Sequence, residues 1–315
     1  MVRSIDRNYC CFVVSVQVAQ GTSSNCQFSI VCVLVPWWLS SYVLGMFMKV
    51  NSNNPIGVFD SGIGGLTVVR AIIEQLPSEN IIYFGDTARV PYGVKSPETI
   101  SRYAAQITEF LLQQKVKVLI IACNTMAAVA YDVIKDLSSV PILDVVDAGA
   151  RSAIAETYNK SVGVIGTPAT INSNAYVKAI KEYDSEIRVL SQPCPLFVPL
   201  VEEGWLDHEV TRLTAQEYLK PVVAQDIDTL VLGCTHYPLL KPLLRKLLGN
   251  QIKLVDSAQT IARETEELLR KNTLQNSQER PPEYRFYVTD VPLRFKQIGE
   301  RFLGRTLSNV TVVKW

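Results

Sequence analysis

Two near-copies of one pattern stand far apart in the chain, each an aliphatic run that ends in a cysteine and a hydroxyl-bearing residue. The copies are residues 118–125 (VLIIACNT) and 230–236 (LVLGCTH). Aliphatic runs that stop at a small residue and a polar cluster indicate buried parallel strands that end at a strand-to-helix turn. Open α/β sheets bind ligands at the carboxyl ends of such strands. The pattern therefore predicts that Cys123 and Cys234 are delivered to ligand-binding edges of parallel sheets.

The repetition extends beyond the cysteines. Residues 56–62 (IGVFDSG) are echoed 106 residues later by residues 162–168 (VGVIGTP), and Cys234 follows Cys123 by 111 residues. Weaker echoes lie between and after them, so that strands alternate with helices in each half. This alternation predicts an α/β protein of two pseudo-symmetric, doubly wound parallel-sheet lobes, with the active site in the cleft between them.

Length and charge agree with two compact lobes that act on a small partner. The 315 residues suit about two domains, and we expect lobe one at 48–147 and lobe two at 148–255. With 31 basic and 30 acidic side chains the net charge is +1, so no basic surface for nucleic acid is indicated. Seven cysteines without regular spacing do not make a disulfide framework, which indicates a reducing compartment.

Helix signals lie between the expected strands. An apolar stripe begins at Leu66 after a glycine-rich turn, and Ser96-Pro97-Glu98 combines a cap, a first-turn proline and a first-turn acid. A third helix is expected from Asn124 to Leu137. The amino termini of such helices point backbone N–H groups into the cleft, where carboxylates bind well.

The first part of the chain does not follow this pattern. Residues 28–48 carry no charge and are long enough to span a bilayer, but Pro36 interrupts them. Met46 and Met48 stand just where the organised sequence begins. We expect residues 1–47 to be an apolar extension foreign to the folded enzyme, with membrane contact through residues 28–48 as the alternative.

The two cysteines are candidates for proton transfer. A thiol is a useful base or nucleophile only as the thiolate, which helix amino termini and neighbouring donors stabilise. In a doubly wound sheet, Asp60 would end the strand next to the one that carries Cys123, and His236 lies two residues after Cys234. A single free cysteine is ordinarily a small apolar packing residue. Two in matched settings favour a function.

Hydroxyl and amide side chains gather at the same turns. Each could be only a helix cap, which is the ordinary role of these residue types. Their number at the strand ends of both lobes favours a small polar ligand with several acceptor atoms. The residues are Ser61, Asn124, Thr125, Thr167, Thr170 and Thr235.

Nucleotide and zinc sites are less well supported. The turn after Asp60 has two glycines of a dinucleotide motif, but Thr67 stands where the third belongs. Asp86 lies where a ribose-binding acid would follow. The chain has only two histidines, His208 and His236, and no pair of cysteines at metal-ligand spacing.

At these residues the chain resembles a known family, the cofactor-independent glutamate racemases of the aspartate and glutamate racemase superfamily. The resemblance runs from about Ile56 to Leu307. Several blocks in order carry it: residues 57–67 (GVFDSGIGGLT), 83–93 (YFGDTARVPYG), 122–125 (ACNT), 166–170 (GTPAT), 195–204 (PLFVPLVEEG) and 233–240 (GCTHYPLL).

The resemblance implies a two-base mechanism. Cys123 would remove the α-proton from D-glutamate and Cys234 from L-glutamate, each reprotonating the opposite face. Asp60 would assist Cys123, while His236 and Glu202 would assist Cys234. The implied substrate-binding residues are Asp60, Ser61, Pro91, Tyr92, Gly93, Asn124, Thr125, Thr167, Thr235 and His236.

The resemblance also implies a setting for the enzyme. The family uses no pyridoxal phosphate and no metal, often forms homodimers, and supplies D-glutamate for peptidoglycan synthesis in the cytoplasm. It further implies that residues 256–315 return to lobe one.

Two other classes of function share parts of this pattern. A two-lobed ligand-binding module would not need matched thiols, and a cysteine hydrolase would need only one thiol with one histidine. The residues alone do not distinguish glutamate from aspartate, because that preference depends on the shape of the cleft.

Overall fold

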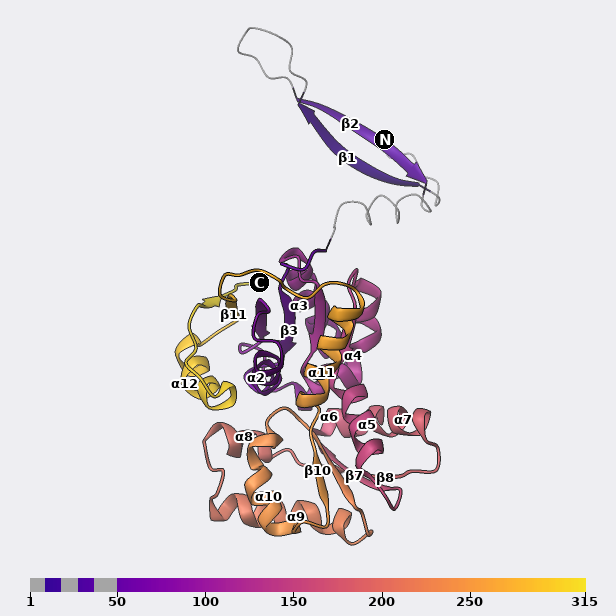
Figure 1. Cartoon of the computed structure of the whole chain (residues 1–315), viewed down its shortest axis with the longest axis vertical. Coiled ribbons are helices and arrows are strands. Elements are labelled where there is room, and N and C mark those ends of the chain that lie inside the picture. Colours follow the sequence, from indigo (N-terminus) through magenta and orange to yellow (C-terminus); the bar gives the residue numbers. More distant parts are fainter. Residues whose placement is uncertain (1–8, 18–27, 37–49) are drawn as a thin grey trace. The chain divides into compact units, whose positions relative to one another are not determined.

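A computed structural model describes residues 9–17, 28–36 and 50–315 (Figure 1). The chain divides into two compact units, Met1–Val50 and Asn51–Trp315, which are described separately. In the first unit, β1 (Tyr9–Gln17) pairs antiparallel with β2 (Phe28–Pro36). The remainder of the uncharged segment predicted at 28–48 lies outside the described residues. No helix in the described part of the chain is both long and apolar enough to cross a membrane.

The second unit contains two parallel sheets, which define two lobes (Figure 1). The strands of lobe one are β3 (Ile56–Asp60), β4 (Ile81–Gly85), β5 (Val118–Ile121), β6 (Ile142–Asp144), β11 (Tyr284–Val288) and β12 (Val310–Val312). The strands of lobe two are β7 (Ser161–Gly166), β8 (Arg188–Pro193), β9 (Thr229–Gly233) and β10 (Lys253–Val255).

Strand order reveals the internal repeat. The sheet of lobe one has the order β12-β11-β4-β3-β5-β6, and that of lobe two has the order β10-β9-β7-β8. In both lobes the first strand in sequence has the second strand on one side and the third strand on its other side, and the fourth strand pairs with the third. All pairings within the two sheets are parallel. The predicted class, two pseudo-symmetric parallel-sheet lobes, is confirmed, and β11 and β12 extend one edge of the first sheet.

Helices cover the sheets and account for the burial of the central strands. In β3, β4, β5, β7 and β9 every residue is buried, as expected for strands covered on both faces. The helices are α2 (Leu66–Gln75), α3 (Pro97–Gln113), α4 (Asn124–Leu137), α5 (Val145–Glu156), α6 (Pro168–Asn172), α7 (Ala175–Tyr183), α8 (Phe197–Glu202), α9 (Glu209–Val223), α10 (Lys241–Leu248), α11 (Ala258–Lys271) and α12 (Pro292–Leu303), with short 3-10 helices η1 (Tyr92–Val94) and η2 (Tyr237–Leu240).

The local helix signals are confirmed at all three predicted positions. Helix α2 begins at Leu66, which is fully buried. The Ser96 hydroxyl accepts a hydrogen bond from the Thr99 N–H at 3.4 Å and caps α3. Helix α4 runs from Asn124 to Leu137, directly after the strand that precedes Cys123. The strand-to-helix turns therefore lie where the sequence pattern places them.

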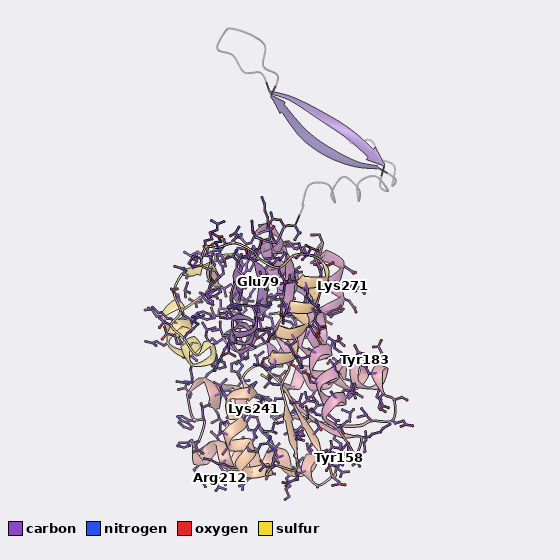
Figure 2. The ribbon with its side chains drawn as sticks, viewed as in Figure 1. Glu79, Tyr158, Tyr183, Arg212, Lys241 and Lys271 are labelled. Atoms are coloured by element: carbon purple, nitrogen blue, oxygen red, sulfur yellow. The ribbon has the colours of Figure 1, made fainter. Side chains whose placement is uncertain are left out.

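Side chains tie the two lobes together along the chain's return path. Helix α11, which follows the last strand of lobe two, packs against α2 of lobe one and also against α5. The guanidinium of Arg151 in α5 makes two hydrogen bonds to Glu264 of α11, at 2.9 and 2.6 Å. Figure 2 shows labelled side chains from both lobes, with Glu79 in lobe one and Lys241 in lobe two. The predicted lobe boundaries at 147, 148 and 255 stay predictions.

Candidate active site

Cys123 and Cys234 line the same cavity of ≈ 370 Å³. Lobe one contributes one wall through the ends of β3 and β5 and the turn around η1. Lobe two contributes the other through the ends of β7 and β9 and through α8. Of the residues predicted for the site, those on the cavity wall are Ser61, Pro91, Tyr92, Gly93, Cys123, Asn124, Thr125, Thr167, Glu202, Cys234, Thr235 and His236.

Cys123 lies at the carboxyl end of β5 and is the N-cap residue of α4. Its side chain is 5% exposed, and its Sγ donates to the Ser61 Oγ across 3.5 Å. Burial, together with the negative charge of Asp60, raises the pKa of the Cys123 thiol to about 12, although the Ser61 hydrogen bond opposes this. The Cys123 thiol is therefore protonated at neutral pH in the free protein.

Asp60 lies behind the cavity wall. It is fully buried, and its Oδ2 accepts a hydrogen bond from the Gly62 N–H at 3.0 Å. It is not among the residues that line the cavity, but its negative charge acts on the Cys123 thiol, which does line it. Its predicted roles as helper of Cys123 and as a substrate-binding residue stay predictions.

Cys234 has different neighbours. It follows β9 and precedes η2, and its Sγ lies 3.9 Å from the Nδ1 of His236. The Nε2 of the same imidazole lies 3.1 Å from the Oε1 of Glu202, the last residue of α8. The three side chains form a continuous series from the sulfur to a carboxylate.

This series fixes the charge of the imidazole. Burial lowers the pKa of His236, but its hydrogen bonds to Cys234 and Glu202 outweigh burial and raise the pKa to about 10. Burial raises the pKa of Glu202, but the hydrogen bond from His236 leaves it below the usual value. An imidazolium beside a carboxylate is therefore expected at neutral pH, with the Cys234 sulfur next to it.

Hydrogen-bonded hydroxyls of three threonines join the two lobes beside the cavity. The Thr125 hydroxyl of lobe one lies 3.0 Å from that of Thr167 and 3.3 Å from that of Thr170, both in lobe two. Thr167 also caps α6. Thr125 and Thr167 face the cavity, whereas Thr170, which sequence reasoning grouped with them, lies behind it. These hydroxyls can donate to a ligand by rotating away from one another.

The amide oxygen of Asn124 accepts a hydrogen bond from the Tyr176 hydroxyl at 2.6 Å. This contact orients the amide, so that its NH₂ group is the part left to donate to a ligand. Asn124 is also the first residue of α4, where backbone N–H groups are free of partners within the helix. This turn can therefore hold a carboxylate.

The turn that carries Tyr92 is held from behind by Asp86. The Tyr92 hydroxyl donates to Asp86 Oδ2, which also accepts from the Arg89 Nε at 2.6 Å. The Thr289 hydroxyl donates to Asp86 Oδ1 at 2.8 Å. Asp86 stands where a dinucleotide site would place its ribose-binding acid. Both of its carboxylate oxygens already accept hydrogen bonds from protein donors.

A close approach between the lobes requires a glycine in the first turn. A Cβ at Gly64 would lie 2.2 Å from the Thr235 Oγ1 and 2.5 Å from the His236 Nδ1. The absence of a side chain there allows the β3–α2 turn of lobe one to touch the residues beside Cys234.

The apolar part of the cavity wall was not predicted from the sequence. Pro195, Val198 and Pro199 line the cavity just before Glu202. The sequence does contain a signal for Val198. It lies four residues, about one helical turn, before Glu202, so both side chains lie on the same face of α8. These three side chains make this part of the cavity wall apolar.

The comparisons with known proteins agree with this geometry. A family model described as Asp/Glu/Hydantoin racemase matches residues 56–265. A glutamate racemase from Syntrophus aciditrophicus (strain SB) is 70% identical over 261 residues, which cover 83% of this chain and 97% of that protein. A glutamate racemase from Neisseria meningitidis serogroup A is 58% identical over 266 residues, covering 84% of this chain and 98% of the relative.

Solved structures of similar proteins share the fold. The crystal structure of glutamate racemase from Francisella tularensis subsp. tularensis SCHU S4 in complex with D-glutamate has a TM-score of 0.79 at 47% identity, and covers 84% of this chain and 98% of that one. The glutamate racemase isoform RacE1 from Bacillus anthracis has a TM-score of 0.81 at 40% identity, with the same coverage. The resemblance noted from the sequence blocks is confirmed.

Proposed function

Since the chain belongs to the Asp/Glu/Hydantoin racemase family and is an isomerase, we propose that it interconverts L- and D-glutamate by proton transfer between two cysteines. The observation that carries this proposal is that Cys123 and Cys234 line one cavity in opposite electrostatic settings. Inversion through a planar carbanion needs a base on one face of the substrate and an acid on the other. A thiol next to Asp60 and a thiolate next to an imidazolium supply that pair.

In the direction from L to D, the Cys234 thiolate takes the α-proton of L-glutamate and becomes a thiol. The electron pair of the broken C–H bond stays on the α-carbon, and the Cys123 thiol delivers its proton to the opposite face. The product is D-glutamate, with Cys123 left as the thiolate. The reverse reaction starts from this second protonation state, so neither direction needs an external acid, oxidant or cofactor.

The α-proton of an amino acid is very weakly acidic, so the carbanion needs fixed donors. We propose that Ser61, Asn124, Thr125, Thr167 and Thr235, with the backbone N–H groups of Tyr92 and Gly93 after Pro91 and of the start of α4, donate to the two carboxylates. Side-chain oxygens of the same residues would accept from the ammonium. Asp60 and His236 are proposed to assist from the two sides. The apolar residues 195–199 keep water out of the cavity and so strengthen these contacts.

The choice of glutamate rests on the relatives. Those reported above are named glutamate racemases, and the Francisella structure contains D-glutamate. We propose further that the D-glutamate supplies peptidoglycan synthesis in the cytoplasm and that the enzyme works as a homodimer without metal or pyridoxal phosphate. Sedimentation of the purified protein tests the dimer, and activity after dialysis against EDTA tests the need for a metal.

The test of the reaction is to incubate the protein with L-glutamate in deuterium oxide without cofactor. The arriving hydron comes from a thiol that has exchanged with solvent, so we expect early D-glutamate to be deuterated at the α-carbon while unreacted L-glutamate is not. Chiral chromatography with mass spectrometry measures both. L-Aspartate in a parallel reaction reports the preference for side-chain length. The absence of D-glutamate would overturn the proposal, and D-glutamate that keeps its original hydrogen would overturn the two-base mechanism.

A further inference from the structure

Helix α12, from the carboxyl-terminal segment, contacts the end of α8 in lobe two. The Arg301 Nη1 donates to the carbonyl oxygens of Val201 and Glu202, at 3.3 and 3.5 Å. These are the last two residues of α8, whose carbonyl groups lack partners within the helix. A cation at a helix carboxyl terminus is favourable for the same reason. Arg301 thus holds the backbone of the residue whose carboxylate binds His236.

The chain is shaped to receive this guanidinium. Gly204, just after α8, has φ +79, and a Cβ there would lie 2.9 Å from Arg301 Nη1 and 3.0 Å from Nη2. A glycine in this position ends the helix in the left-handed region and leaves the space that the guanidinium fills. The contact between Arg301 and α8 therefore depends on a matching feature in lobe two.

The next residue of α12 contacts the imidazole directly. The Phe302 ring packs edge-on against the His236 ring, with 5.1 Å between centroids and 78° between planes. Phe302 is 1% exposed, so its position is fixed by packing. Two consecutive residues of one helix thus contact the His236 ring and the backbone of Glu202, which binds that ring.

Helix α12 is itself anchored in lobe one. It packs on α2, and its Phe295 stacks on Tyr83 of β4 with ring centroids 6.0 Å apart. A rigid element of one lobe therefore fixes the helpers of the thiol that lies in the other lobe. The neighbours of Cys123, in contrast, are Ser61 and Asp60 from the adjacent strand of its own sheet.

We infer that Arg301 is a positioning residue for proton transfer at Cys234, acting through the backbone of Glu202 while Phe302 orients His236. The inference rests on the proposed racemase function and deepens it, since it assigns α12 to one of the two proton transfers. Misplacement of a catalytic group by on the order of 1 Å can cost about a hundredfold in rate. We expect Arg301→Met to lower kcat/KM by roughly ten- to a hundredfold on this basis.

A matched control is Lys296→Met on the same helix. Lys296 is exposed, so this variant also removes a cation from α12 while leaving α8 untouched. It should keep the wild-type kcat/KM. Arg301→Lys should restore part of the loss, because a lysine keeps the positive charge but carries a compact ammonium group in place of the planar guanidinium. Thermal unfolding of each variant shows that the protein compared is folded.

The decisive readout is the primary deuterium isotope effect on kcat/KM, measured with each α-deuterated enantiomer. Enantiomers have equal free energy in solution, so kcat/KM falls equally in both directions and does not reveal which transfer has slowed. If the transfer at Cys234 slows, the ratio of the isotope effect from L-glutamate to that from D-glutamate rises in Arg301→Met. A purely structural loss lowers the amount of active enzyme and leaves this ratio unchanged.

The experiment distinguishes a failure of the proposed racemase function from a failure of the proposed role of Arg301. A wild-type protein that does not racemise glutamate overturns the proposed function. An active wild type with an unchanged isotope-effect ratio in Arg301→Met, or an equal loss of activity in Lys296→Met, overturns the role of Arg301. A raised ratio in Arg301→Met, with partial return in Arg301→Lys, supports it.

Discussion

At the scale of single residues, the two thiols differ through the charge next to them. Burial and the nearby Asp60 carboxylate raise the pKa of the Cys123 thiol, whereas Cys234 lies beside the His236 imidazole, whose own pKa is raised. In the proposed mechanism this difference supplies one acid and one base without any added group.

The charge on His236 can be measured directly. The chain contains two histidines, so a His208→Gln variant leaves a single imidazole to follow by proton NMR. We expect the His236 resonance to titrate with a pKa of about 10. In Glu202→Gln the pKa should fall, because one of the two contacts that favour the imidazolium loses its charge. A His236 resonance that titrates at the ordinary histidine value would contradict the assignment.

The raised pKa of His236 makes the stability of the folded protein depend on pH. A histidine whose pKa is raised in the folded state stabilises that state fully below its unfolded pKa, and this contribution disappears as the pH rises through the folded pKa. The contribution of His236 should therefore decline from about pH 6.5, the unfolded value, to about pH 10. Thermal unfolding across this range should show a smaller decline in His236→Gln than in the wild type.

At the scale of elements, parallel strands bring together turns that are distant in the chain. The aliphatic runs before Cys123 and Cys234 predicted these strands because central strands are buried on both faces and leave a continuous apolar signal. The side chain of Asp60 was harder to place. Successive residues of a strand point to opposite faces, and a short apolar run does not say which of Asp60 and Ser61 faces the ligand.

Contacts between distant helices left no local signal. The Phe302 ring packs against His236, and Arg301 donates a hydrogen bond to the end of α8. Both contacts depend on the packing of α12 on α2. An amphipathic pattern shows that α12 has a buried face but does not name its partner. Val198, in the apolar part of the cavity wall, belongs to the 195–204 block that resembles a known family. Its place at the site could therefore have been predicted from the sequence.

A buried ion pair joins several connecting segments of lobe one. Lys117 is fully buried, and its Nζ donates to Glu79, to the Ser52 carbonyl at 2.6 Å and to the Leu274 carbonyl at 2.8 Å. Glu79 also accepts from the Asn276 N–H at 2.8 Å. The pair thus fastens the segment before β3 and the segment after α11 to the same end of the sheet.

Breaking this pair from one side should be costly. We expect Lys117→Met to lower the free energy of unfolding by about 3–5 kcal/mol, because it leaves the Glu79 carboxylate buried without its partner. The double variant Lys117→Met with Glu79→Gln should lose less. Urea unfolding measures both, with the exposed Lys178→Met expected to stay within about 0.5 kcal/mol of the wild type. A double variant that loses as much as the single one would contradict this reasoning.

At the scale of the whole molecule, the catalytic cavity belongs entirely to the second unit, Asn51–Trp315. The two strands β1 and β2 pair with each other in the first unit. The glutamate racemases from Syntrophus and Neisseria match 83% and 84% of this chain over nearly their whole lengths. The expectation that residues 1–47 are foreign to the folded enzyme stays a prediction.

Removal of these residues tests that expectation. A chain of residues 48–315 should unfold at the wild-type temperature and keep kcat/KM within about twofold, since the hydrogen bonds and packing of the site lie outside the deleted part. Thermal unfolding and steady-state kinetics of the two chains make the comparison. A large loss of either property would assign the first unit a role in the enzyme.

The proposed two-base reaction requires one sulfur on each side of the substrate. Cys123→Ala and Cys234→Ala should each lower the rate of glutamate racemisation by at least about a hundredfold, the usual contribution of a positioned acid or base. Cys194→Ala is the matched control, because Cys194 is buried but does not line the cavity. Circular dichroism of the glutamate enantiomers follows the reaction in all three. Loss in the first two variants and retention in the third is the predicted result, and full activity in either of the first two would contradict the account.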